Sequence, residues 1–152
     1  MGQSREVPTA ESGRSNKRTA PRIVLADDHA GVLAETRFLL EPYFSVVAEA
    51  CDGSALVETV RATSPDAVIA DVEMPGMNGI EAGREIVSRG LCGAIVMLSM
   101  YNDPQLVQRA LRAGIRGYVL KDDAGDDLIR ALETVLAGGC YLSRGVAGAG
   151  RL

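Results

Sequence analysis

The residues best suited to chemistry in this chain are polar side chains that directly follow short apolar runs. Asp27 and Asp28 follow one such run, and Asp71, Ser99 and Lys121 each close another. Oxygen ligands favour Mg²⁺, with Mn²⁺ or Ca²⁺ as possible substitutes, over zinc. An aspartate pair after a strand is more often a solvated loop or a helix cap. The chemistry therefore depends on whether the fold brings these five residues together.

Apolar patterning predicts the elements that must position them. Short runs rich in aliphatic residues predict strands at residues 22–27, 45–50, 66–71, 94–99 and 117–121. The first, third and fourth are nearly continuous, which is typical of strands covered on both faces of a parallel sheet. Apolar stripes of helical spacing lie between and after them. This alternation predicts an α/β fold, a (βα)5 doubly wound parallel sheet with helices on both faces.

In such a sheet, ligands bind beyond the carboxyl ends of the strands. If the first and third strands are neighbours, the three aspartates meet at one edge with Ser99 and Lys121 beside them. Five unrelated loop residues at the same end of alternating strands would be an improbable coincidence. The pattern therefore favours a divalent-cation site over five solvated loop residues without a shared role.

The composition of the chain excludes several classes of protein. A chain of 152 residues with 47% hydrophobic and 24% charged residues suits one globular domain. The net charge of −4 gives no support for direct nucleic-acid binding. No apolar run approaches the ~20 residues of a membrane span, and residues 1–21 are predicted to be a disordered leader rather than a signal peptide. Three widely spaced cysteines and one histidine disfavour a disulfide framework or zinc site and indicate a cytoplasmic protein.

Four segments together resemble the receiver domain of two-component response regulators. They are LADDH at 25–29, DVEMPGMNG at 71–79, LSMY at 98–101 and GYVLKDD at 117–123. The resemblance covers residues 22–143, which we expect to form the domain, and it implies a flavodoxin-like sheet of strand order 2-1-3-4-5. It implies a phosphorelay switch rather than an ordinary enzyme: the protein would accept a phosphoryl group from a sensor histidine kinase and assist its own phosphorylation and dephosphorylation.

The resemblance implies a role for each acidic residue of the site. Asp71 is the expected phosphoacceptor, forming an aspartyl phosphate. Asp28 and Asp71 would ligate Mg²⁺ directly, together with the backbone carbonyl of Glu73. Asp27 would hold a metal-bound water.

The same resemblance implies phosphoryl-binding and switch residues. Lys121 would pair with the phosphoryl oxygens, and Ser99 would donate a hydrogen bond to one of them. Ser99 and Tyr118 would form the switch, the tyrosine turning inward as the hydroxyl moves. The added charge would shift a two-state equilibrium and create a partner or homodimer surface. We interpret His29 as bordering the site or starting the first helix rather than as a phosphocarrier. The acids after Lys121 are expected to complement the positive end of the last helix rather than to bind metal; they are Asp122, Asp123, Asp126 and Asp127.

The segment KDDAGDDLIRALETVLAGGCYLS, residues 121–143, resembles the NarL/FixJ (LuxR-type) subgroup. In that subgroup a receiver leads through a linker to a helix-turn-helix, which implies transcription regulation. In many receivers a proline follows the lysine, but Asp122 follows here. Residues 144–152 are predicted to be a flexible tail or the start of a linker, too short for a DNA-binding domain. We therefore expect no direct nucleic-acid binding and DNA contact only through an absent output domain.

Three other functions are known for α/β folds of this type. A phosphorylation-independent receiver-like binding module would carry the acids as a remnant, although a complete set with Lys121 and Ser99 argues against it. A metal-dependent phosphatase with an aspartate nucleophile would need a cap segment and a second general base, and neither is visible. A flavin site would want a phosphate loop after the first strand, where DDHAG is unfavourable.

Overall fold

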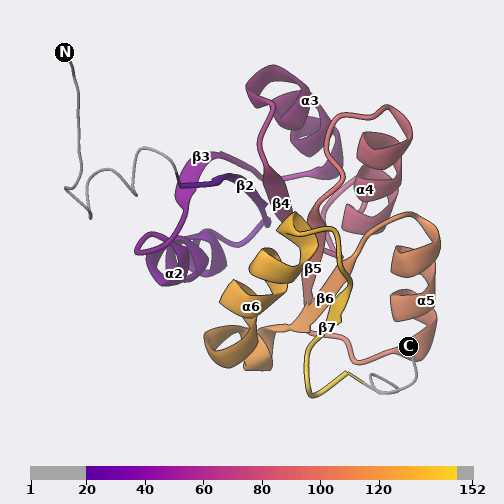
Figure 1. Ribbon diagram of the computed structural model, residues 1–152. Helices are drawn as coiled ribbons and strands as arrows, with labels where there is room; N and C mark the ends of the chain where they lie inside the picture. Colours follow the sequence, from indigo (N-terminus) through magenta and orange to yellow (C-terminus); the bar gives the residue numbers. More distant parts are fainter. Residues whose placement is uncertain (1–19, 147–152) are drawn as a thin grey trace, which may run out of the picture.

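The computed structural model describes residues 20–146, which form a parallel sheet covered by helices on both faces (Figure 1). The strands are β2 (Arg22–Ala26), β3 (Ser45–Ala50), β4 (Ala67–Asp71), β5 (Ile95–Ser99), β6 (Gly117–Leu120) and β7 (Tyr141–Leu142). The helices are α2 (Ala30–Leu40), α3 (Gly53–Thr63), α4 (Gly79–Ser88), α5 (Pro104–Arg112) and α6 (Ala124–Leu136), with a 3₁₀ turn η1 (Lys121–Asp123) before α6. Most of the predicted leader and residues 147–152 of the predicted tail lie outside the described residues.

The sheet has the order β3-β2-β4-β5-β6-β7, and every neighbouring pair is parallel. Its first five strands confirm the predicted flavodoxin-like order 2-1-3-4-5. The sixth, β7, was not predicted; it pairs Tyr141 with Gly117 and Leu142 with Tyr118. Two residues are too few to show a periodic pattern, so only the folded sheet reveals this strand.

The two faces of the sheet are covered by different helices. Alternate residues of each strand point to opposite faces, so Ile23 and Leu25 belong to the hydrophobic cluster that includes residues of α2 and α6, whereas Val24 belongs to the cluster that includes residues of α3, α4 and α5. Figure 1 shows this division, with α2 and α6 together on one face. Both faces are thus buried, which explains the nearly continuous apolar runs.

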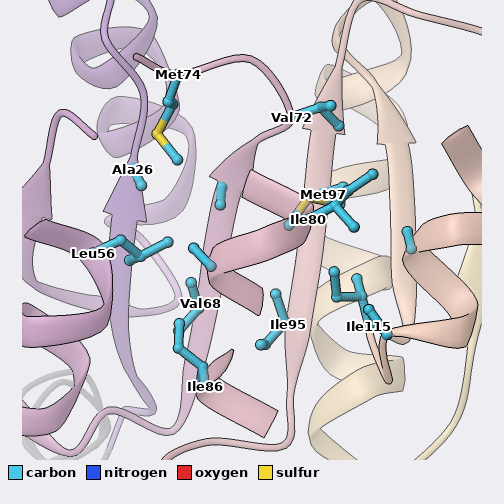
Figure 2. Packing of buried hydrophobic residues seen from close by; sticks show 14 of the residues in the cluster. Ala26, Leu56, Val68, Val72, Met74, Ile80, Ile86, Ile95, Met97 and Ile115 are labelled. Atoms are coloured by element: carbon cyan, nitrogen blue, oxygen red, sulfur yellow. The ribbon is translucent and has the colours of Figure 1, made fainter. Parts of the chain in front are cut away.

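The core on the α3–α4–α5 face lies directly behind the carboxyl ends of β2 and β4. Figure 2 shows Leu56 of α3 near β2, and Ile86 of α4 next to Val68 of β4, with Ile95 of β5 close by. All four side chains are buried almost completely. This rigid layer holds the strand ends that carry the polar residues.

The loop after β4 is held closely against the start of α4. Asn78 caps α4 by accepting from the Glu81 backbone N–H, and the Glu81 side chain accepts from the Asn78 N–H in return. A Cβ on Gly79 would lie 2.0 Å from the backbone oxygen of Asp71, so only glycine fits there. Among residues 20–146 there is no helix long and apolar enough to cross a membrane.

Candidate acidic phosphoacceptor site

The three aspartates come together at the carboxyl ends of neighbouring strands. Ala26 of β2 pairs with Ala70 of β4, which places Asp27 beside Asp71. Ligand atoms of Asp27, Asp28, His29 and Asp71 all lie within 4.8 Å of one another. Parallel strands end at one edge of the sheet, and this is why residues 44 positions apart in sequence form one cluster.

Lys121 is the cation of this cluster. Its Nζ lies 3.1 Å from Asp27 Oδ2 and 3.3 Å from Asp71 Oδ2. Burial alone would lower the pKa of Lys121, but the hydrogen bond to Asp27 and the charges of both aspartates raise it overall. Lys121 is therefore a firmly protonated ammonium group between two carboxylates.

The three aspartates differ in how far their side chains are exposed to solvent. The side chains of Asp27 and Asp71 are only 4% and 7% exposed, whereas that of Asp28 is 36% exposed. Burial, and then the negative charge of Asp27, raise the pKa of Asp71 above its ordinary value, against the opposing pull of Lys121. Burial next to a second carboxylate thus disfavours the charged form of Asp71.

His29 borders the cluster, as the sequence suggested. Its backbone N–H donates to Asp27 Oδ1 at 2.9 Å, and its ring Nδ1 lies 3.1 Å from that oxygen and 3.0 Å from Asp28 Oδ1. His29 occupies the N-cap position of α2 without a side-chain cap bond to the helix. Its ring is turned toward the carboxylates, while two-thirds of it stays exposed to solvent.

Asp71 also contacts the loop that follows it. Its Oδ1 accepts from the Glu73 backbone N–H at 3.3 Å, which orients the carboxylate. A hydrogen bond to the Glu73 side chain raises the pKa of Tyr101, which places these two side chains together at the rim. The metal-binding role of the Glu73 backbone carbonyl stays a prediction.

Ser99 and Tyr118 form a second, buried polar group behind the acids. Ser99 Oγ accepts from the Tyr101 backbone N–H at 2.9 Å. The Tyr118 phenol donates to the Tyr101 carbonyl oxygen at 2.8 Å and lies 3.1 Å from Ser99 Oγ, its second partner. Tyr118 is fully buried, and this burial raises its pKa. The tyrosine lies in the inward position here; its movement stays a prediction.

An open cleft of about 680 Å³ lies beside the acids. Asp28 and His29 line one side of it, and Glu73, Met74 and Tyr101 are among the residues that line the rest. The exposed carboxylate of Asp28 therefore faces a space large enough for a small phosphodonor or a partner's side chain.

Sequence reasoning missed Ser143 as a neighbour of the site. Its buried hydroxyl donates to Asp123 Oδ2 at 2.8 Å and accepts from the Leu120 N–H at 3.1 Å. The segment YLS at 141–143 resembles the NarL/FixJ subgroup, and nothing in its spacing points to Lys121. Asp127 also accepts from the Arg144 N–H, so two of the acids assigned to the helix end hold the C-terminal segment as well.

Comparison with known proteins agrees with this geometry. Residues 23–133 match the response regulator receiver domain family. The nitrate/nitrite response regulator protein NarL of Escherichia coli is 37% identical over 131 residues, which cover 85% of this chain and 60% of NarL. The chain spans 52% to 63% of the length of the most similar curated relatives.

Solved structures show the same similarity. A LuxR-family two-component response regulator from Aurantimonas has a TM-score of 0.80 and 37% identity, over 86% of this chain and 94% of that one. The isolated RcsB receiver of Salmonella enterica, solved with the phosphomimetic BeF3−, has a TM-score of 0.76 and 30% identity, over 84% and 96% of the two chains. The family match covers well over half of the sequence, and the chain therefore belongs to the response regulator receiver domain family, with NarL- and LuxR-type regulators as its relatives.

Proposed function

We propose that this receiver domain is a phosphorylation-controlled switch in which Asp71 accepts a phosphoryl group from a sensor histidine kinase. The observation that carries the proposal is the position of Asp71. Its carboxylate is almost buried, it lies 3.3 Å from the ammonium group of Lys121, and it shares an acidic cluster with Asp27 and Asp28. A carboxylate nucleophile needs such neighbours, because the phosphoryl group that it attacks is itself negative.

The residues of the cluster fit Mg²⁺. The carboxylate oxygens of three aspartates lie within 4.8 Å of one another, and within residues 20–146 Lys121 is the only lysine paired with them. We assign Asp28, Asp71 and the Glu73 backbone carbonyl as ligands, with Asp27 acting through a water molecule. When bound, Mg²⁺ would neutralise the carboxylates and the phosphoryl oxygens, so that attack by Asp71 is not opposed by repulsion.

The chain's own groups supply the rest of the chemistry. A carboxylate oxygen of Asp71 forms a bond to phosphorus as the bond from phosphorus to the donor's histidine nitrogen breaks, and that nitrogen keeps the electron pair. Lys121 pairs with the phosphoryl oxygens that carry the spread charge. Ser99 Oγ accepts from the Tyr101 N–H, and the Ser99 O–H donates to a phosphoryl oxygen.

The proposed switch lies in the contacts of that hydroxyl. A Ser99 side chain drawn toward the phosphoryl group changes its contact with the Tyr118 phenol, which also holds the Tyr101 carbonyl. Phosphorylation would stabilise the inward tyrosine and the loop that leads into α5. The surface formed by α5, β6 and α6 would then bind a partner or a second copy of the chain. The greater length of the NarL-type relatives supports control of an output domain.

Labelling with a small phosphodonor tests the proposal. With Mg²⁺ and acetyl phosphate, the intact mass should rise by one phosphoryl group, and chelation of Mg²⁺ should prevent the rise. The Asp71→Asn variant should take no label, whereas Asp122→Asn, at an exposed acid outside the cluster, should be labelled normally. Equal labelling of Asp71→Asn would refute the assignment. A wild type without Mg²⁺-dependent label would instead indicate a phosphorylation-independent binding module.

A further inference from the structure

The loop that carries Lys121 is tied to a segment from the far end of the described chain. Ser143 Oγ donates to Asp123 Oδ2 at 2.8 Å, and the Gly145 N–H donates to the same oxygen at 3.0 Å. Ser143 Oγ also accepts from the Leu120 N–H at 3.1 Å. One serine hydroxyl therefore bonds the residue before Lys121 and the second residue after it.

This segment, residues 143–146, fits closely against the domain. Ser143 is completely buried, and its backbone N–H donates to the Tyr118 carbonyl oxygen as an extension of the β6–β7 pairing. Val146 is 3% exposed and belongs to the same hydrophobic cluster as Tyr118. A Cβ on Gly145 would lie 2.8 Å from Asp123 Oδ2. A buried hydroxyl with both of its bonds made is a specific arrangement, because leaving either partner unpaired is costly.

The segment also reaches the loop after β5. Asn102 Nδ2 donates to the Gly145 carbonyl oxygen at 2.7 Å. Asn102 follows Tyr101, whose backbone groups bond Ser99 and Tyr118. Four consecutive residues thus contact both loops that carry the proposed phosphoryl-binding groups, the loop after Ser99 and the turn that begins at Lys121.

We propose that Ser143, acting through Asp123, is a positioning residue for Lys121. This inference rests on the proposed phosphoacceptor function. Lys121 has a long side chain, and its ammonium group pairs with Asp71 only if the start of η1 is held in place. The bonds from Ser143 to both sides of Lys121 hold it, and loss of such positioning slows a reaction without any loss of a reacting group. The bond between Asn102 and Gly145 couples this turn to the Ser99 loop.

The test compares labelling rate with metal affinity. In the Ser143→Ala variant, labelling by acetyl phosphate should be about tenfold slower. The Leu120 N–H loses its acceptor and Asp123 Oδ2 loses one of its two donors, which loosens the turn on both sides of Lys121. The Mg²⁺ dissociation constant should be unchanged, because the variant leaves Asp27, Asp28 and Asp71 as they are. Amide hydrogen exchange at Leu120, which loses its acceptor, should become faster.

Paired variants distinguish loss of positioning from a general folding defect. Asp123→Ala should slow labelling as Ser143→Ala does, whereas Asp123→Asn keeps an oxygen for Ser143 and Gly145 and should retain most of the rate. Asp122→Ala removes a charge of the same sign at the neighbouring exposed position and should be labelled as the wild type is. Ser88→Ala, which removes a serine hydroxyl bonded at the end of α4, is the matched serine control.

The possible outcomes are distinct. A Ser143→Ala protein labelled as fast as the wild type would overturn the positioning role alone. An equal loss of labelling and of Mg²⁺ affinity would also overturn it, because it would indicate a merely structural defect. A wild type that takes no label would overturn the proposed function and the positioning role together.

Discussion

Replacement of Lys121 by methionine should destabilise the metal-free protein, and the cost should depend on Mg²⁺. At 3.1 and 3.3 Å from its two carboxylates, the ammonium group gains about 5 kcal/mol of Coulomb attraction from each at an effective dielectric constant of about 20. The desolvation of these nearly buried groups offsets much of this gain. Because removal of one partner leaves Asp27 and Asp71 uncompensated, we expect Lys121→Met to lower the free energy of unfolding by about 3 kcal/mol.

Two conditions should reduce this cost. Saturating Mg²⁺ neutralises the same carboxylates, so the difference from wild type should fall to about 1 kcal/mol or less. Lower pH should act in the same direction. The pKa of Asp71 is already raised, so the stability that this group contributes is complete at low pH and is lost as the pH rises through its folded-state pKa. Without Lys121 that pKa rises further, and the cost should be largest at neutral pH and shrink toward the ordinary aspartate value of 3.8.

Urea unfolding followed by circular dichroism measures these differences, since a single domain of this size is expected to unfold in one step. Arg89→Met is the control: it removes a surface cation 3.1 Å from Glu85 and should cost less than about 0.5 kcal/mol. A Lys121→Met protein that loses no more than this control, or that loses the same amount with and without Mg²⁺, would refute the reasoning.

Three other substitutions give separate tests. Asp28→Asn should weaken Mg²⁺ binding by at least about tenfold more than Asp27→Asn, because only Asp28 is proposed to touch the metal; equal losses in a calorimetric titration would contradict these roles. Tyr118→Phe should lower the free energy of unfolding by about 1–2 kcal/mol, because it leaves a buried hydroxyl and a carbonyl without their phenol partner; unchanged urea unfolding would count against the observed bonds. Gly79→Ala should destabilise the fold by more than about 2 kcal/mol and slow labelling, since its Cβ has no room beside the backbone of Asp71. Gly125→Ala, with open space around the new methyl group, should be neutral or stabilising in the same urea unfolding.

Local patterns were sufficient to predict the elements of the fold. The run AVIAD is buried at every position of β4, and its lack of alternation predicted a strand covered on both faces. Asp103 caps α5 and Pro104 begins it, as their types require at a helix start. The observed strands differ from the predicted ones by one residue at some ends. For example, Asp66 lies outside β4 and accepts from the Arg22 N–H through its side chain.

The edge of the sheet that carries the acids was also predictable. Parallel strand direction follows from the alternation of strands and helices, and the strand order 2-1-3-4-5, which the receiver resemblance implied, then brings Asp27, Asp28 and Asp71 together. The choice of partners within the cluster was not predictable. Lys121 contacts Asp27 and Asp71, and the difference in burial between these two and Asp28 arises only when the surrounding loops pack.

The sequence by itself thus determined the order of elements and the types of residue at the end of each strand, because strand burial and helix caps depend on neighbours a few positions apart. The tertiary structure decided which of these residues are paired, which are buried, and which are held in place by segments far away in the sequence. Ser143 and Asp123 are 20 positions apart, and no periodic pattern links them. They meet because β7 adds to the sheet beside β6, a contact whose free energy comes from burial and hydrogen bonding in the assembled sheet rather than from local preference.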